Sequence, residues 1–190
     1  PAPLLARTEN NFSPPFQQAL ASVRLDAATK LAWQSERFWE REDHIYGGLG
    51  YLEHEVRFLW YPSNGLNTRE GVLVGCYNTG ALALASGAQS IAERAEKSRA
   101  AVELAHPGRG ALLRHPVSVN WKDIPFTEGP WANLYPGQTY DHLNTPEGRV
   151  HLAGDWLSQI VGWQEGAALS AQRAVLAIVA QARETSAPRL

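Results

Sequence analysis

The sequence predicts a chain of the α/β class, on three observations. Three segments with strand-like patterns lie close together between turn residues, which favours an antiparallel sheet. A segment rich in Ala, Glu and Arg over 83–104 has the apolar spacing of a helix. Near the end of the chain, an apolar stretch that ends in Gly154–Asp155 precedes a second helix rich in small residues.

The first elements follow from caps and alternation. Ser13 and Pro14 predict the start of a short helix that ends near Ser22. From residue 29 the side chains alternate as in a strand, so Leu31, Trp33 and Ser35 share one face and Lys30, Ala32 and Gln34 the other. Two further strands are expected at 55–61 and 72–77, the second of them buried.

The later elements follow from the same patterns. The helix over 83–104 should stop at His106-Pro107-Gly108. We expect a short strand at 117–121, a long functional loop at 125–148, a strand at 150–155, a helix at 162–182 and a loose tail at 186–190.

Composition excludes several classes of protein. The chain has 190 residues, 44% hydrophobic and 19% charged, which indicates a globular fold. Its net charge of −2 gives no electrostatic reason to bind nucleic acid or an anionic membrane, and no apolar run approaches a membrane span. The single cysteine, Cys76, excludes an internal disulfide framework, and no histidine pair has metal-ligand spacing, so no metal site is expected. Asp43 and His44 are expected to be solvated turn residues.

The strongest local signal lies over 149–174, RVHLAGDWLSQIVGWQEGAALSAQRA. A helix N-terminus presents unpaired N–H groups and a positive partial charge, so the helix that opens at Gly162 favours a group that gains negative charge. Asp155 is placed to accept hydrogen bonds from a sugar or ribityl hydroxyl. The alternative is an ordinary strand–helix unit in which Asp155 is a loop residue, and the spacing alone does not separate the two.

This segment resembles the C-terminal FAD signature of the flavin amine oxidases, in particular their L-amino acid oxidase branch. Upstream segments are similar to the same family in the family's order, and together they cover about 10–182: Thr29-Lys30, Arg37-Phe38-Trp39-Glu40, Ile45-Tyr46-Gly47-Gly48, Trp60-Tyr61-Pro62-Ser63 and Gly71-Val72-Leu73 through Tyr77. The resemblance implies a two-domain FAD-linked fold, with a mixed or antiparallel substrate-domain sheet and a C-terminal strand and helix that complete the FAD domain. Residues 1–148 would belong to the substrate domain and 149–190 to the FAD domain.

The resemblance also implies roles for single residues. Lys30 matches the family lysine that holds a water near flavin N5; by pattern alone it is a lysine extending from a strand end. Trp60 and Tyr77 match aromatic positions of the substrate pocket, where the tyrosine donates to the substrate carboxylate; the alternative is core or hairpin packing. Trp163 matches the aromatic wall beside the flavin, and the Gly162 backbone would accept from the substrate amine.

The implied FAD contacts extend over both parts of the chain. Trp121 matches a tryptophan close to the isoalloxazine ring, with burial in the sheet as the alternative. Monoamine oxidases carry a flavin-linking cysteine after that position, but the stretch here is Glu128-Gly129-Pro130-Trp131, so the resemblance implies non-covalent FAD. The remaining implied contacts are Gly154, Asp155, Gly162, Trp163, Gln164 and Ala167.

The family's N-terminal G-x-G-x-x-G fingerprint is absent from these residues. The chain also contains no Met. We therefore expect a subunit or fragment of a processed precursor, active only together with a longer chain that carries the fingerprint, in a hetero-oligomer. The compartment, cytoplasm or secretion after processing, stays open.

The implied reaction is oxidation of an L-amino acid by hydride transfer to flavin, then hydrolysis to a 2-oxo acid and ammonia, with O2 reduced to hydrogen peroxide. A neutral amine is required, so activity should rise toward alkaline pH. Three alternatives stay open: an amino acid 2-monooxygenase, an amine or polyamine oxidase, and a structural fragment without catalysis.

Overall fold

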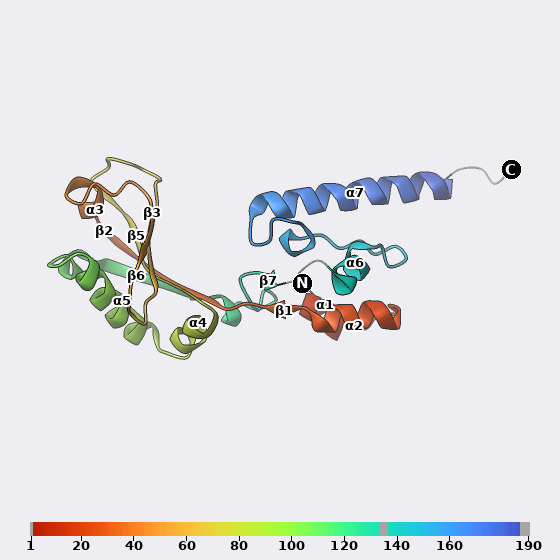
Figure 1. Cartoon of the computed structure of the whole chain (residues 1–190), viewed down its shortest axis with the longest axis horizontal. Helices are drawn as coiled ribbons and strands as arrows, with labels where there is room; N and C mark the ends of the chain where they lie inside the picture. Colours follow the sequence, from red (N-terminus) through yellow and green to blue (C-terminus); the bar gives the residue numbers. More distant parts are fainter. Residues whose placement is uncertain (1, 134–136, 187–190) are drawn as a thin grey trace. The chain divides into compact units, whose positions relative to one another are not determined.

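The computed structural model describes residues 2–133 and 137–186. The chain divides into two compact units, which we describe separately. One unit is Ala27–Gly129, and the other combines Pro1–Asp26 with Pro130–Leu190 (Figure 1). These limits differ from the functional division expected at residue 148, and the roles assigned to 1–148 and 149–190 stay predictions. The expected tail falls largely on 187–190, outside the described residues.

The unit Ala27–Gly129 is built on a five-stranded antiparallel sheet, and the antiparallel arrangement predicted for three of its strands is confirmed. The long strand β2 lies between β5 and β6, so the segment that carries Lys30 occupies the interior of the sheet. The ladder between β4 and β5 is irregular, because it shifts register between Phe58 and Trp60. In spatial order the strands are β3 (Gly48–Tyr51), β4 (Phe58–Tyr61), β5 (Glu70–Thr79), β2 (Ala28–Glu36) and β6 (Arg114–Asn120).

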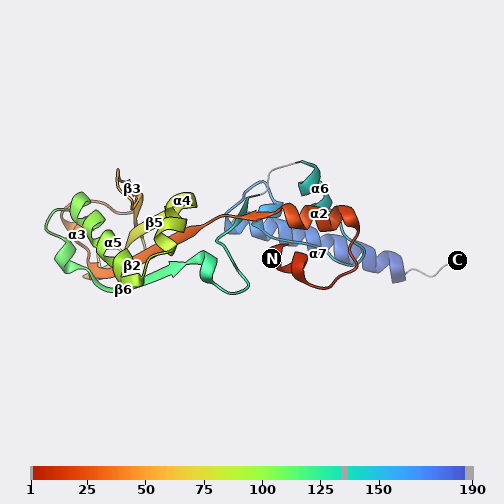
Figure 2. The same ribbon diagram turned by 90° about the horizontal axis from the view of Figure 1, so that it is seen from below.

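One face of this sheet forms the core. Leu31 and Trp33 of β2 are buried there, as their alternation predicted. Helices α4 (Gly80–Gly87) and α5 (Ile91–Ala105) pack against the same face (Figures 1 and 2). Trp33 Nε1 donates to Ser98 Oγ of α5 at 2.8 Å, so the buried indole keeps its polar partner. The short helix α3 (Phe38–Arg41) adds Phe38 and Trp39 to this core.

The single helix predicted over 83–104 is wrong. The structure has two helices, α4 (Gly80–Gly87) and α5 (Ile91–Ala105). Ser90 starts α5 with a capping box: Ser90 Oγ accepts from Glu93 N–H at 3.2 Å, and Glu93 Oε2 accepts from Ser90 N–H at 2.8 Å. Satisfying the first N–H groups of α5 in this way favours a new helix over a continuous one.

The second unit is mainly helical. Its core joins Phe16 and Leu20 with Leu143, Trp156 and Leu157. The helix predicted from Ser13 onward is confirmed as α2, and the one predicted over 162–182 as α7. The expected loop 125–148 contains a two-residue strand and a helix, while its residues 134–136 lie outside the described part. The elements are α1 (Ala2–Arg7), α2 (Pro14–Ser22), β1 (Arg24–Leu25), β7 (Ala132–Asn133), α6 (Gln138–Asn144), η3 (Asp155–Leu157) and α7 (Gln164–Ser186).

The strand predicted at 150–155 does not form. Val150 makes an isolated antiparallel bridge with Glu147, and Asp155 already belongs to the 3₁₀ turn η3. A strand needs a neighbouring strand for its backbone groups. Among the described residues this stretch has that one bridge, so its apolar pattern does not become a ladder.

Candidate functional site

On the open face of the five-stranded sheet, a lysine lies against two aromatic rings. Lys30 Nζ lies 4.4 Å from the centroid of the Tyr77 ring and 4.9 Å from that of Trp60. The two rings are stacked, with centroids 6.3 Å apart and an interplanar angle of 28°. The structure therefore brings together the three residues for which a role in substrate or oxygen chemistry was predicted in this unit.

The strand register explains this arrangement. Lys30 of β2 is paired with Tyr77 of β5, so their side chains leave the same side of the sheet at one level. Trp60 comes from β4 on the far side of β5, and 38% of its surface is exposed. Burial between the rings lowers the pKa of Lys30 below the usual 10.5. A cation held against π faces keeps a partial electrostatic compensation for its lost hydration.

A groove of about 380 Å³ hollows the same face of the sheet. Ala32 and Gln34, which follow Lys30 on this side of β2, form part of it together with Val72 and Val117. Val72 and Val117 are 46% and 65% exposed, so apolar surface continues along the strands away from the lysine. Glu70 also lines the groove, where its carboxylate binds Arg114 and accepts from Gln34. A concave, mostly apolar surface with a few polar groups suits a small organic ligand.

Trp121 lies at the end of β6 that is closest to Lys30. It opens the short turn η2 (Trp121–Asp123), directly after Asn120, which is paired with Thr29. Val119, two residues earlier, is paired with Lys30 itself. Trp121 is half-buried rather than part of the core, so its predicted place beside a flavin stays a prediction.

The other predicted cofactor contacts meet in one turn before α7. Asp155 Oδ2 accepts from the Gly162 N–H at 2.7 Å and so closes the loop that joins them. Gly162 has a φ of +82°, a conformation that favours glycine. The backbone then enters α7, where the Ala167 N–H donates to the Trp163 carbonyl at 3.2 Å. Trp163 is 70% exposed, Gln164 is exposed, and Gly154 N–H donates to Ser170 Oγ at 3.2 Å.

Gly166 sets how closely this loop approaches α7. A Cβ atom at this position would lie 2.2 Å from the Ile160 carbonyl oxygen and 2.4 Å from Ser158 Oγ. We expect Gly166→Ala to destabilise the chain by about 1–3 kcal/mol, because backbone must move to admit the methyl group. Ala168→Ser, on the exposed side of the same helix turn, is the control and should cost less than about 0.7 kcal/mol of helix propensity. Urea unfolding of both variants measures the difference, and equal midpoints would contradict the close approach.

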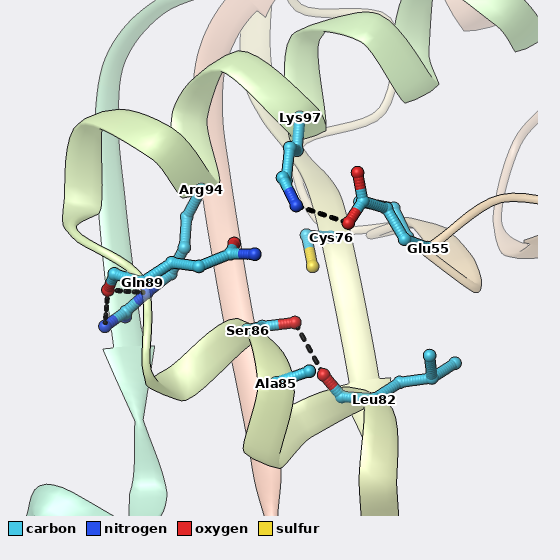
Figure 3. A pocket seen from close by; sticks show the side chains of 9 residues that line it. Glu55, Cys76, Leu82, Ala85, Ser86, Gln89, Arg94 and Lys97 are labelled. Carbon is cyan, nitrogen blue, oxygen red and sulfur yellow. Dashed lines mark hydrogen bonds and ion pairs between the residues drawn. The ribbon is translucent and has the colours of Figure 1, made fainter.

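A second cavity lies on the core side of the sheet, between α4, α5 and β5 (Figure 3). Its volume of about 30 Å³ suits water rather than an organic substrate. Cys76 faces it, and burial raises the pKa of this thiol to about 12, which keeps it protonated and a poor nucleophile. Lys97 and Glu55 form an ion pair at its rim. This cavity is no candidate for the chemistry.

Two buried polar groups escaped the sequence analysis. Asp43 was expected to be simply solvated, but its Oδ2 lies 2.8 Å from His106 Nδ1, and His106 Nε2 lies 2.7 Å from Tyr61 Oη. Arg37 and Glu40 form a buried ion pair. The sequence did hold a signal for the Arg37–Glu40 pair, since an Arg and a Glu stand three positions apart within an apolar stretch. The contacts among Asp43, His106 and Tyr61 join positions far apart in sequence, so no local pattern indicates them.

The described residues show neither a metal cluster nor a membrane span. Within 2–133 and 137–186, no three His, Cys, Asp or Glu side chains gather as metal ligands would. In the same ranges no helix has both the length and the apolar character to cross a membrane.

Comparison with known proteins identifies the class. The model of the flavin containing amine oxidoreductases matches residues 1–179, and the chain belongs to this family. An L-amino-acid oxidase of Siganus canaliculatus is 34% identical over 164 residues, which are 83% of this chain and 31% of that protein. The flavin-dependent L-tryptophan oxidase RebO of Lentzea aerocolonigenes is 32% identical over 176 residues, 86% of this chain and 36% of that enzyme. The chain thus spans about a third of the length of the relatives it matches.

Solved structures agree on the fold. A putrescine oxidase with bound putrescine superposes with a TM-score of 0.79 at 21% identity, over 95% of this chain and 41% of that one. Cyclohexylamine oxidase of Brevibacterium oxydans gives a TM-score of 0.78 at 21% identity, over 90% and 39%. The predicted flavin amine oxidase fold is therefore confirmed, together with the family.

Proposed function

We propose that the chain is part of an FAD-dependent L-amino acid oxidase that converts an L-amino acid, water and O2 to a 2-oxo acid, ammonia and hydrogen peroxide. The observation that carries the proposal is the Lys30 ammonium, which lies against the rings of Trp60 and Tyr77 on the open face of the sheet. L-amino-acid oxidases among the relatives support the choice of substrate class.

The residues at the start of α7 have the charge and the aromatic surface that a flavin requires. The N-terminus of the 23-residue helix α7 has a positive partial charge, and the exposed Trp163 ring and the tight Asp155–Gly162 turn stand directly before it. Bound there, FAD supplies the acceptor for the two electrons of the amine. We propose that this binding is non-covalent. In support, the one cysteine of the chain, Cys76, is buried on the core side of the sheet, and its raised pKa disfavours a thioether link.

We assign roles to the chain's own side chains from the family resemblance, and their placement supports the assignment. Lys30 is a fixed positive charge that orients a water molecule and stabilises negative charge developing on oxygen. Trp60 and Tyr77 wall the substrate, and the Tyr77 hydroxyl donates to its carboxylate. The Gly162 carbonyl accepts from the amine, which must be neutral to react, so turnover should rise from about pH 6 to about pH 9.

We also propose that the oxidase acts together with a longer chain that carries the G-x-G-x-x-G fingerprint. In support, α7 carries an apolar stripe of exposed side chains. Exposed apolar surface of this kind marks an interaction site. The residues of the stripe are Leu169, Val175, Leu176, Ile178 and Val179, each 40% to 62% exposed. A denaturing gel of the native enzyme should show the second, longer band; a fully active preparation with one species of this mass would exclude it.

Product analysis separates the oxidase from the monooxygenase alternative. With a single L-amino acid the oxidase yields ammonia, hydrogen peroxide and 2-oxo acid in equal amounts. A 2-monooxygenase yields instead an amide and carbon dioxide. Amide as the main product, in the presence of catalase, would decide against the proposal.

Substitution of Tyr77 tests the amine oxidase alternative. We expect Tyr77→Phe to lower kcat/KM for L-amino acids about 10-fold or more, since one hydrogen bond to a charged carboxylate is lost, at about 1.5–3 kcal/mol. Turnover of the corresponding decarboxylated amine should not change. Equal losses for both substrates would indicate that Tyr77 does not recognise a carboxylate.

A further inference from the structure

A chain of three polar side chains runs through the core behind Trp60. Tyr61 Oη lies 2.7 Å from His106 Nε2, and His106 Nδ1 lies 2.8 Å from Asp43 Oδ2. Tyr61 and His106 are 4% and 7% exposed, whereas the side chain of Asp43 is 42% exposed. The rings of Phe38 and Tyr61 both meet the imidazole edge to face. The Asp43 end of this row of side chains therefore contacts solvent, and the Tyr61 end lies in the sheet.

The proton positions follow from chemistry. A carboxylate only accepts hydrogen bonds, so the Nδ1–H of His106 donates to Asp43. In the neutral imidazole Nε2 then accepts from the Tyr61 hydroxyl. Burial, with a smaller contribution from Asp43, raises the pKa of Tyr61 to about 12, so the phenol keeps its proton.

Strand β4 depends on this anchor more than its neighbours do. Its four residues pair with β5 through an irregular ladder, with matched partners at Phe58 and Trp60 and a register shift between them. Tyr61 follows Trp60 directly, and alternation sends Tyr61 into the core and Trp60 onto the open face. Since His106 is the C-cap of α5, its hydrogen bond with Tyr61 ties β4 to a 15-residue helix. The position of Tyr61 thus fixes that of Trp60.

We propose that Tyr61, His106 and Asp43 form a hydrogen-bonded positioning network that holds Trp60 against Lys30. Two other carboxylates close to this network in sequence have their own partners, because Glu42 binds Arg109 and Glu103 accepts from the Gly108 and Gly110 N–H groups. Asp43 is thus the charge in direct contact with His106. The network alters the lysine environment through Trp60, without touching the substrate face.

Lysine signals in NMR test this on the full chain without cofactor or substrate. The chain has three lysines, at positions 30, 97 and 122, which reductive ¹³C-methylation labels together. The methyl signal of Lys30 should be displaced upfield by the rings of Trp60 and Tyr77. In Tyr61→Phe we expect most of this displacement to be lost, with the Lys97 and Lys122 signals unchanged. Tyr51→Phe is the matched control, because it removes a hydroxyl from the adjacent strand at a 71% exposed side chain.

A pair of substitutions at Asp43 adds a readout that simple packing would not change. Asp43→Asn keeps an acceptor for the His106 Nδ1–H, so the upfield displacement of the Lys30 signal should persist. Asp43→Leu leaves this N–H without its acceptor, so part of the displacement should be lost. Should Tyr61→Phe fail to fold, Asp43→Asn and Asp43→Leu still decide.

Two results would overturn the network. One is a Lys30 signal that is the same in the parent and in Tyr61→Phe. The other is a Lys30 displacement that is the same in Asp43→Asn and in Asp43→Leu. The relevance of the network to catalysis rests on the proposed function, but the lysine signals do not. A failed oxidase assay with the expected NMR shifts would therefore count against the function and not against the network.

Discussion

Replacing Lys30 by Met should lower O2-dependent turnover of the assembled oxidase about 100-fold, the usual loss on removing one preorganised electrostatic group. Met has nearly the same length and fills the space between Trp60 and Tyr77, so packing is preserved. The loss should fall on kcat rather than on KM for the amino acid, because the ammonium acts on oxygen chemistry and the aromatic walls hold the substrate. Stopped-flow measurement at saturating amino acid isolates the effect on kcat from any effect on KM.

Folding stability distinguishes this chemical effect from a damaged fold. The pKa of Lys30 is lowered by burial, so over the range between that value and 10.5 the unfolded chain binds more protons than the folded one. Stability therefore gains a contribution that increases as pH rises through this range, and the charged lysine weakens the fold below it. Lys30→Met removes this dependence and should leave thermal stability at pH 7 unchanged or higher. Lys97→Met, at an exposed ion pair on α5, is the control and should retain turnover. A Lys30→Met enzyme with parental turnover would contradict the role of the ammonium.

Replacing Arg37 by Met should destabilise the unit Ala27–Gly129 by about 3–5 kcal/mol, the expected cost of leaving one partner of a buried ion pair alone. The side chains of Arg37 and Glu40 are 3% and 2% exposed. Arg37 Nη2 also donates to the Asn64 carbonyl at 2.6 Å, and Nε to Thr68 Oγ1 at 3.0 Å. Glu40 Oε2 in turn accepts from the Asn67 N–H at 2.9 Å. The pair thus holds the loop that joins β4 to β5.

Two further variants test this account by chemical denaturation. Arg37→Met combined with Glu40→Leu removes both charges, so it should recover part of the loss in a double-mutant cycle. Arg69→Met breaks a pair with Glu36 whose side chains are 79% and 43% exposed, and it should cost less than about 1 kcal/mol. Similar losses for Arg37→Met and Arg69→Met would show that burial of the pair does not matter.

The sheet was predictable because its signals are local. Alternation over 29–35 assigned Lys30 to the face opposite Leu31 and Trp33, and the structure confirms it. The long helix over 83–104 was wrong because the capping box at Ser90 outweighed a continuous helical pattern. The strand at 150–155 was wrong because a strand depends on partners far away in sequence, which apolar alternation does not reveal.

In the candidate site, too, the residues could be predicted where their signals are local, and their long-range contacts could not. A family resemblance named Lys30, Trp60 and Tyr77, and strand register explains why they meet. The contact of Asp155 with Gly162 was not foreseen, although both residues were named. The chain Asp43–His106–Tyr61 joins three segments separated by 18 to 63 residues, so only the fold brings it together.

Anaerobic bleaching of the flavin is the measurement that tests the proposed oxidase most directly. The native assembly that contains this chain should elute with visible flavin bands that are released on denaturation. Single L-amino acids should bleach these bands without O2, and air should restore them with one hydrogen peroxide per flavin. A colourless assembly unable to take up FAD, or a flavin bleached by amines and not by L-amino acids, would contradict the account.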